Sequence, residues 1–190
     1  MQHYKDAWAI VKQNLMGWVL FFLVFFLAIG ITCGLGGWLF SVNAFRATRD
    51  AINEDRGPEI GDIFSFDNVG TDVMTVLFRG IATAIGILAC GVGAWAVAIL
   101  TFFALPLAAD GKYVSVSALK ASFAHAKTCW VEILVFALIG SLVIFAGELA
   151  CLVGVFVAIP VFYVAWWLFY VEHRDAILAA AAEAGVEATA

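Results

Sequence analysis

One acidic residue is a candidate for proton or cation chemistry because it lies within a long apolar stretch. Glu148 belongs to residues 128–171, which contain no Lys or Arg and only one other charge, Glu132. An ionisable group inside a membrane segment is a candidate proton or cation site, because hydrocarbon solvates a charge poorly. If a turn reaches the far headgroups just after Glu148, its carboxylate is merely interfacial. The sequence leaves both alternatives open and favours the interfacial one.

Three of the four cysteines lie beside glycines within apolar stretches. We expect these residues at helical-hairpin turns: Cys33, Gly36, Cys90, Gly93, Cys151 and Gly154. Converging thiolates could bind a soft metal, or form a disulfide on an oxidising face. No CxxC or Cys/His spacing accompanies them, and cysteine is also a common small buried residue. We therefore predict that the protein has no metal site and no cofactor.

The remaining reactive residues show no catalytic pattern. His3, His125 and His173 fall in polar or interfacial segments, where surface roles are expected. The chain has no GxSxG, no HExxH and no glycine loop that would hold a phosphate. We predict that the protein is not an enzyme and has no catalytic residues.

Three further residues could serve function through the membrane helices themselves. Pro106 and Pro160 can kink a helix and free backbone carbonyls, as at transporter sites, although the same breaks occur in ordinary packing. Arg79 lies 11 residues before Cys90, so its guanidinium would snorkel toward the headgroups from a short helix.

Composition assigns the chain to the membrane. Of its 190 residues, 64% are hydrophobic and 13% are charged, and the mean hydropathy is +1.00. A soluble domain is about half apolar and about a quarter charged. The net charge is −5 with no basic cluster, so we expect membrane lipid as a partner and no nucleic acid. Acidic residues gather between Asp50 and Asp72, which suggests a solvated connection or, alternatively, a cation-binding or partner-docking loop.

Three stretches without Lys or Arg are candidates for membrane helices: residues 13–45, 80–109 and 128–171. One crossing helix needs about 20 residues, so the third stretch accommodates two. An amphipathic segment precedes each stretch. These segments carry Trp8, Val11 and Leu15; Ile60, Ile63 and Phe64; and Val116, Leu119 and Phe123.

An internal repeat suggests that all three stretches fold alike. Residues 86–93 recur as residues 147–154, identical at six of eight positions, and a looser copy begins at Cys33. Such periods indicate a repeated supersecondary unit. We expect a single membrane domain over residues 1–175, with repeat units at about 1–55, 56–112 and 113–175 and an Ala-rich tail at 176–190. Glycines such as Gly30 and Gly34 would let helices approach closely.

Charge placement distinguishes two topologies. With three hairpins, all ten Lys and Arg lie on one side of the membrane, whereas four spans would divide them six against four. Lys and Arg prefer the cytoplasmic side. We therefore predict an all-α fold of six short membrane helices in three hairpins, with amphipathic lead helices and cytoplasmic termini. Four spans are the alternative.

Several short motifs resemble those of known membrane proteins. They are Gly61-Asp-Ile-Phe64, Ala104-Leu-Pro106-Leu, Ala118-Leu-Lys120-Ala-Ser122, Trp130, Cys151-Leu-Val-Gly154, Pro160 and Tyr170. This pattern resembles a broad group of small bacterial membrane proteins and is similar to the membrane domain of some glycerophosphoryl diester phosphodiesterases. The resemblance implies a helical membrane fold in a bacterial inner membrane and carries over no catalytic residue. Ala94 departs from it, because many relatives carry Pro-Gly there.

Two functional hypotheses follow. The first is a non-enzymatic component of a membrane assembly, acting through helix packing with a protein partner or as a homo-oligomer, or a hairpin protein that shapes the membrane. The second is a small-molecule or ion transporter or channel that uses Glu148.

Overall fold

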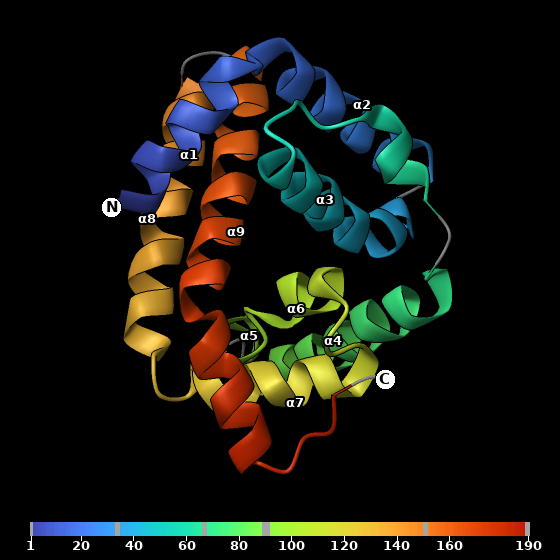
Figure 1. Cartoon of the computed structure of the whole chain (residues 1–190), viewed down its shortest axis with the longest axis vertical. Coiled ribbons are helices and arrows are strands. Elements are labelled where there is room, and N and C mark those ends of the chain that lie inside the picture. The colour runs from blue at the N-terminus through green and yellow to red at the C-terminus, as the bar shows by residue number, and fades with distance from the viewer. Residues whose placement is uncertain (1, 33–34, 66–67, 89–91, 150–151, 189–190) are drawn as a thin grey trace. The chain divides into compact units, whose positions relative to one another are not determined.

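Helices form most of the described chain in the computed structural model (Figure 1). The structure describes residues 2–32, 35–65, 68–88, 92–149 and 152–188, and these contain no strand. Apolar segments favour helices because a backbone in hydrocarbon must satisfy its hydrogen bonds internally. The elements are α1 (Gln2–Gln13), α2 (Leu15–Ile31), α3 (Leu35–Asn53), the 3-10 helix η1 (Ile60–Phe64), α4 (Val69–Leu88), α5 (Val92–Leu100), α6 (Ala104–Asp110), α7 (Ser115–Ala126), α8 (Trp130–Leu149) and α9 (Leu152–Glu183).

By length and composition, four helical segments of the described chain could cross a bilayer. They are Val69–Ile87, Gly93–Asp110, Trp130–Leu149 and Gly154–Glu183. Helices α1 and α2 meet at 98° and would add a fifth span if the pair crosses together. The described chain is thus all-helical, in keeping with a multi-pass membrane protein, and two of the candidate spans begin in its third charge-poor stretch, as expected. The arrangement of six helices in three hairpins stays a prediction.

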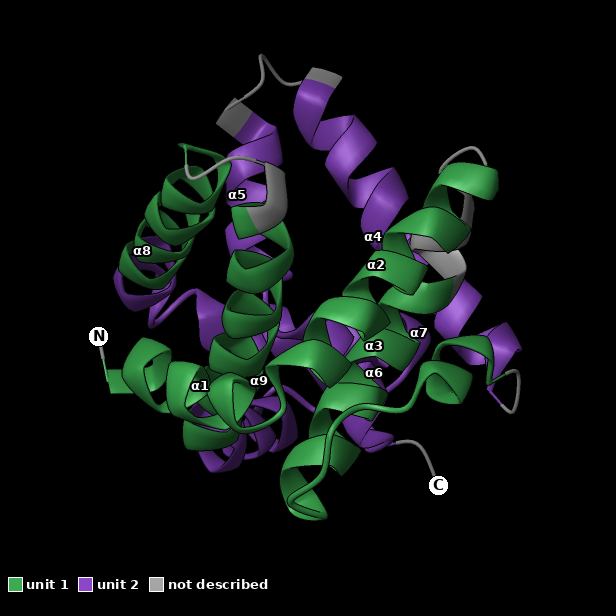
Figure 2. Cartoon of the chain, turned by 90° about the horizontal axis from the view of Figure 1, so that it is seen from above, with its two compact units in different colours: residues 1–65, 135–172 green, residues 66–134, 173–190 purple. Residues whose placement is uncertain are grey.

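The chain divides into two compact units (Figure 2). Unit 1 comprises residues 1–65 and 135–172, and unit 2 comprises residues 66–134 and 173–190. The expected single membrane domain with repeat units at about 1–55, 56–112 and 113–175 stays a prediction. The expected tail begins inside α9, where Ile177 and Ala181 are fully buried.

Helix α1 of unit 1 is amphipathic and buries one side. Its buried residues are Tyr4, Ala7 and Val11, spaced three and four apart, whereas Trp8 is 45% exposed. The Tyr4 hydroxyl donates a hydrogen bond of 2.9 Å to the carbonyl oxygen of Phe136 in α8.

Aromatic rings fill the core of unit 1 around Tyr163 of α9. Its ring centroid lies 4.8 Å from that of Phe22 and 5.0 Å from that of Phe45. Phe45 also packs edge-on against Trp166, at 4.8 Å. Aromatic pairs at these distances stabilise a core beyond the area they bury, and here they join α2, α3 and α9.

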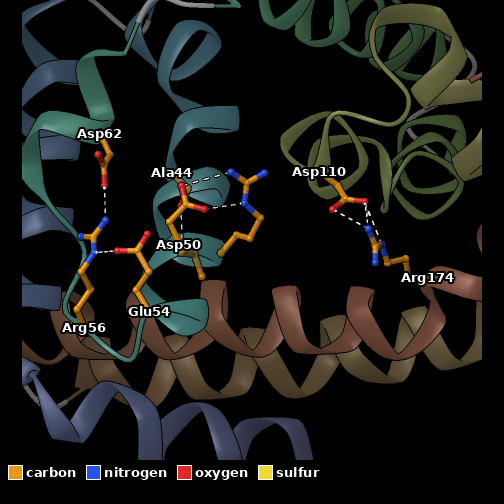
Figure 3. Close-up of polar contacts among 9 residues, drawn as sticks. Ala44, Asp50, Glu54, Arg56, Asp62, Asp110 and Arg174 are labelled. Atoms are coloured by element: carbon orange, nitrogen blue, oxygen red, sulfur yellow. Dashed lines mark hydrogen bonds and ion pairs between the residues drawn. The ribbon is translucent and has the colours of Figure 1, made fainter. Parts of the chain in front are cut away.

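The acidic segment after α3 is held by one asparagine and one arginine. The side chain of Asn43 donates to the carbonyl oxygens of Ile63 and Ser65, at 3.1 and 2.7 Å, which fixes η1 against α3. Arg56 forms ion pairs with carboxylates on both sides of it, including Glu54 (Figure 3). Glu54 is largely exposed, so this segment has the character of a solvated connection.

Glycines of the internal repeat lie at close helix contacts in both units. In unit 1, a Cβ added to Gly147 of α8 would lie 2.8 Å from the carbonyl oxygen of Gly154 in α9. In unit 2, a Cβ added to Gly86 of α4 would lie 2.7 Å from the backbone of Gly93 in α5. These glycines allow the close backbone approach that membrane helices use. A Cβ added to Gly30 would meet nothing within 4 Å among the described residues, and Gly34 lies outside them, so the close approach expected there stays a prediction.

In unit 2, α4 packs against α5, α6 and α7. The helix that begins as α5 is interrupted before Pro106, which lacks a backbone N–H and disfavours an uninterrupted helix. The Ser122 hydroxyl of α7 occupies the break: it donates to the Leu100 carbonyl at 2.9 Å and accepts from the Phe103 N–H at 3.1 Å. Ser122 is fully buried, so one side chain satisfies two backbone groups that the break leaves open.

Candidate metal centre

Three metal-binding side chains converge in unit 2. One ligand atom from each of His125, Cys129 and His173 lies within 4.8 Å of the others. Cys129 is buried, with 8% of its surface exposed, and the two histidines are partly buried. The described part of the chain contains no other group of three His, Cys, Asp or Glu residues that could hold a metal ion.

The connection from α7 to α8 positions two of these ligands. His125 lies in the last turn of α7, and Cys129 follows it by four residues. The His125 carbonyl oxygen accepts hydrogen bonds from the N–H and the hydroxyl of Thr128, at 2.9 and 2.7 Å, and a longer one from the Cys129 thiol at 3.6 Å. This tight turn places the imidazole and the thiol side by side.

The third ligand comes from α9 and is packed by an aromatic ring. The His173 ring stacks on Phe103 at a centroid distance of 5.7 Å, and Phe103 also packs against His125 at 5.9 Å. The two imidazole centroids are 5.6 Å apart. Phe103 therefore limits the motion of both rings.

An ion pair fixes α9 beside His173. Arg174 donates to both carboxylate oxygens of Asp110 at 2.9–3.1 Å, and the Asp110 side chain is only 11% exposed (Figure 3). A bidentate pair of this kind restricts both distance and orientation. It anchors the residue next to His173 to the end of α6.

The surroundings of His125 favour its neutral imidazole, which has a lone pair that can bind a metal. Its Nε2 atom is buried and has no hydrogen-bond partner among the described residues. Burial lowers the pKa of His125, and the neighbouring His173 lowers it further, against a small opposing effect of Glu132. The imidazole is then neutral near pH 7, which is the form that binds metals. A buried nitrogen without a partner is costly, so a ligand atom would satisfy it.

The thiol is held in its protonated form in the absence of a metal. Burial, together with the nearby Glu132 charge, raises the pKa of the Cys129 thiol to about 11, against an opposing backbone hydrogen bond. A metal cation would reverse this balance, because thiolate is the coordinating form and metal binding displaces the proton.

The residues fit a Zn²⁺ ion or a similar transition metal. Imidazole nitrogen and thiolate sulfur are both ligands that Zn²⁺ takes in proteins, and three of them would leave the fourth tetrahedral position open. Tetrahedral Zn²⁺ needs ligand atoms roughly 3.3–3.8 Å apart, given bonds of about 2.0–2.3 Å, so the side chains would move inward by about 1 Å. Glu132 Oε2 lies 3.1 Å from His173 Nε2 and could serve as the fourth ligand or as the acceptor that orients His173.

None of the other predicted residues that the structure describes belongs to this cluster. Glu148 is exposed one residue before the end of α8 and makes no hydrogen bond or ion pair with the described residues. Arg79 of α4 donates to the Thr101 hydroxyl at 3.3 Å. Pro160 is buried within α9, and Pro106 lies in the first turn of α6.

The predicted turn residues are only partly described. Cys33, Cys90 and Cys151 lie outside the described residues. The glycines expected beside them instead begin helices, since each lies in the first turn of its element. These glycines are Gly36 in α3, Gly93 in α5 and Gly154 in α9.

The sequence does not predict this cluster, because its three residues form no standard metal-binding motif and each histidine by itself suggests a surface role. The spacing of His125 and Cys129 was nevertheless a usable signal, since residues four apart lie on one face of a helix or close across a tight turn. His173 is 48 residues from His125, and no local pattern connects them.

Comparison of the chain with protein-family models, with curated proteins and with solved structures found no match. The resemblance to small bacterial membrane proteins thus stays a prediction, and function has to be argued from the geometry.

Proposed function

We propose that this protein is a non-enzymatic, multi-pass protein of the bacterial inner membrane whose unit 2 binds one Zn²⁺ ion through His125, Cys129 and His173. The observation that carries the proposal is the convergence of these three side chains, one of which, His125, has a buried Nε2 atom with no hydrogen-bond partner among the described residues. The ion would be structural, because it would join the end of α7, the start of α8 and α9. The proposal revises the expectation, drawn from the sequence, of a protein without a metal site.

The proposed topology supports a metal rather than a disulfide. With cytoplasmic termini and connections, the cluster faces the reducing side of the membrane, where thiols stay reduced. Within an assembly, a metal that fixes one end of the helices would give a defined surface for a protein partner or a second copy. We therefore retain the role of accessory component.

Metal binding by the purified protein tests the proposal. In detergent, we expect one Zn²⁺ per chain, and one Co²⁺ with the near-ultraviolet charge-transfer band of a thiolate ligand. Cys129→Ser should remove this band, and His125→Ala should weaken Zn²⁺ binding at least about tenfold, since even outer-shell changes cost about 10- to 100-fold.

Two control variants separate this site from other thiols and histidines. The triple variant Cys33→Ser, Cys90→Ser, Cys151→Ser keeps Cys129 as the only thiol and should retain the band. His3→Ala removes a histidine that pairs with Glu172 in unit 1, at 2.7 Å, and should bind Zn²⁺ normally. A band that survives in Cys129→Ser, or disappears in the triple variant, would refute the proposed site.

The transport alternative has its own test. Glu148 is exposed near the end of α8, as an interfacial carboxylate would be. If Glu148 carries a proton or cation, flux into proteoliposomes should fall in Glu148→Gln. Equal flux in the two proteins removes Glu148 from any such mechanism.

A further inference from the structure

A groove in unit 2 has largely apolar walls, and none of the three metal-binding side chains lines it. Its volume is about 600 Å³, within the range of small-molecule sites. Val97 and Leu100 of α5 contribute to one wall, Leu119 and Phe123 of α7 to another, and Val186 of the C-terminal segment also lines it. Helix α5 begins a segment that could cross the bilayer.

Helix α7 exposes an apolar surface at this groove. The sequence predicted that Val116, Leu119 and Phe123 form the apolar face of α7, yet the buried residues of α7 are its small ones, such as Ala118 and Ala121. Phe123 is 50% exposed. An exposed apolar surface that runs along a groove indicates a binding surface for an apolar ligand.

Two lysines give the groove its charge. Lys120 of α7 and Lys127, the residue directly after α7, both line it, seven residues apart in sequence with Phe123 between them. No acidic residue lines the groove, and neither lysine forms an ion pair with a carboxylate of the described residues. Glu187 lines an adjoining groove that shares Lys120. In a chain of net charge −5, this is a local site for an anion beside apolar walls.

We propose that the groove binds an anionic phospholipid, with one acyl chain along α5 and α7 and the phosphate between Lys120 and Lys127. Lysine stems can cover apolar surface while their ammonium groups reach the headgroup level. Basic residues at a membrane surface attract anionic lipids, each with an appreciable share of the binding energy. A zwitterionic lipid offers the same chains without the net charge, so charge is what distinguishes the two. This inference is independent of the metal site.

Native mass spectrometry of the detergent-solubilised protein tests the proposal. We expect phosphatidylglycerol to bind more tightly than phosphatidylcholine of the same chains. The double variant Lys120→Gln, Lys127→Gln should weaken phosphatidylglycerol binding roughly 10- to 30-fold, the effect of removing two lysine attractions at a membrane surface. The matched control Lys5→Gln, Lys12→Gln removes the same charge from α1 and should bind as the parent does.

A second variant tests the acyl-chain contact. Phe123→Ser should weaken binding of long-chain phosphatidylglycerol severalfold but leave a short-chain analogue nearly unchanged. Phe78→Ser, which removes a ring of similar exposure (37%) on α4 outside the groove, should change neither. Unaltered Zn²⁺ binding or unaltered circular dichroism in each variant shows that it is folded.

Three outcomes would overturn the proposal. One is an equal loss of phosphatidylglycerol binding in the Lys120 and Lys127 double variant and in the Lys5 and Lys12 control, because the attraction would then depend on the total charge of the protein and not on the groove. Another is full binding in the Lys120 and Lys127 double variant. The third is a photoreactive residue at position 123 that cross-links a second copy of the chain in place of lipid.

Discussion

Replacing Ser122 by alanine should destabilise the protein measurably, although the change removes a single oxygen atom. The hydroxyl makes two hydrogen bonds to backbone groups at the break between α5 and α6, and its residue is fully buried. Each bond contributes about 1 kcal/mol net, and an unsatisfied buried group adds a desolvation cost. Bonds between membrane helices average less, about 0.6 kcal/mol. We therefore expect a loss of about 2 kcal/mol, within a range of about 1–3.

Reversible unfolding in mixed micelles with increasing dodecyl sulfate, followed by circular dichroism, measures this loss. Ser141→Ala is the matched control, because Ser141 is exposed and its hydroxyl bonds only to the Leu138 carbonyl of its own helix, at 2.8 Å. The control should change the free energy of unfolding by less than about 0.5 kcal/mol. If Ser122→Ala costs no more than Ser141→Ala, the break does not depend on the Ser122 hydroxyl and the reasoning fails.

Three further predictions concern helix contacts and topology. Gly147→Ala should lower the free energy of unfolding by about 1–3 kcal/mol through overpacking, whereas Gly30→Ala should be neutral or stabilising by up to about 1 kcal/mol; the same titration compares them. Asp110→Ala should weaken Co²⁺ binding severalfold by releasing Arg174, while Asp110→Asn should retain much of the affinity; full affinity in both would show that the ion pair does not position His173. Membrane-impermeant reagents should fail to label residues 46–72 in intact cells, and labelling there would favour the four-span topology.

Helix content was predictable because it depends on long runs without charge. The absence of Lys and Arg from residues 128–171 is a property of composition, and it correctly predicted two apolar segments there. The buried faces of the lead helices were less predictable. Helix α7 buries small residues and exposes Phe123. Where neighbouring helices approach closely, only alanine and serine fit between them, and the sequence of α7 alone does not indicate where that approach occurs.

The candidate site was the least predictable part. Glu148 is a candidate by sequence because charge is rare in an apolar stretch, yet its side chain is exposed and it is not part of the His125, Cys129 and His173 cluster. His125 and Cys129 are close in sequence, but His173 joins them only through the path of α9. A ligand set assembled from distant segments leaves no local trace, so it emerges only from the fold.

The paired glycines restrict how the chain can change in length. Gly86 and Gly93, like Gly147 and Gly154, are separated by six residues, and in each pair the two backbones nearly touch. A helix turns by about 100° per residue. One residue inserted within either second helix, just before its glycine, would rotate that glycine out of the contact and bring a bulkier neighbour in. Natural variation between these glycines should therefore replace residues freely while conserving their number.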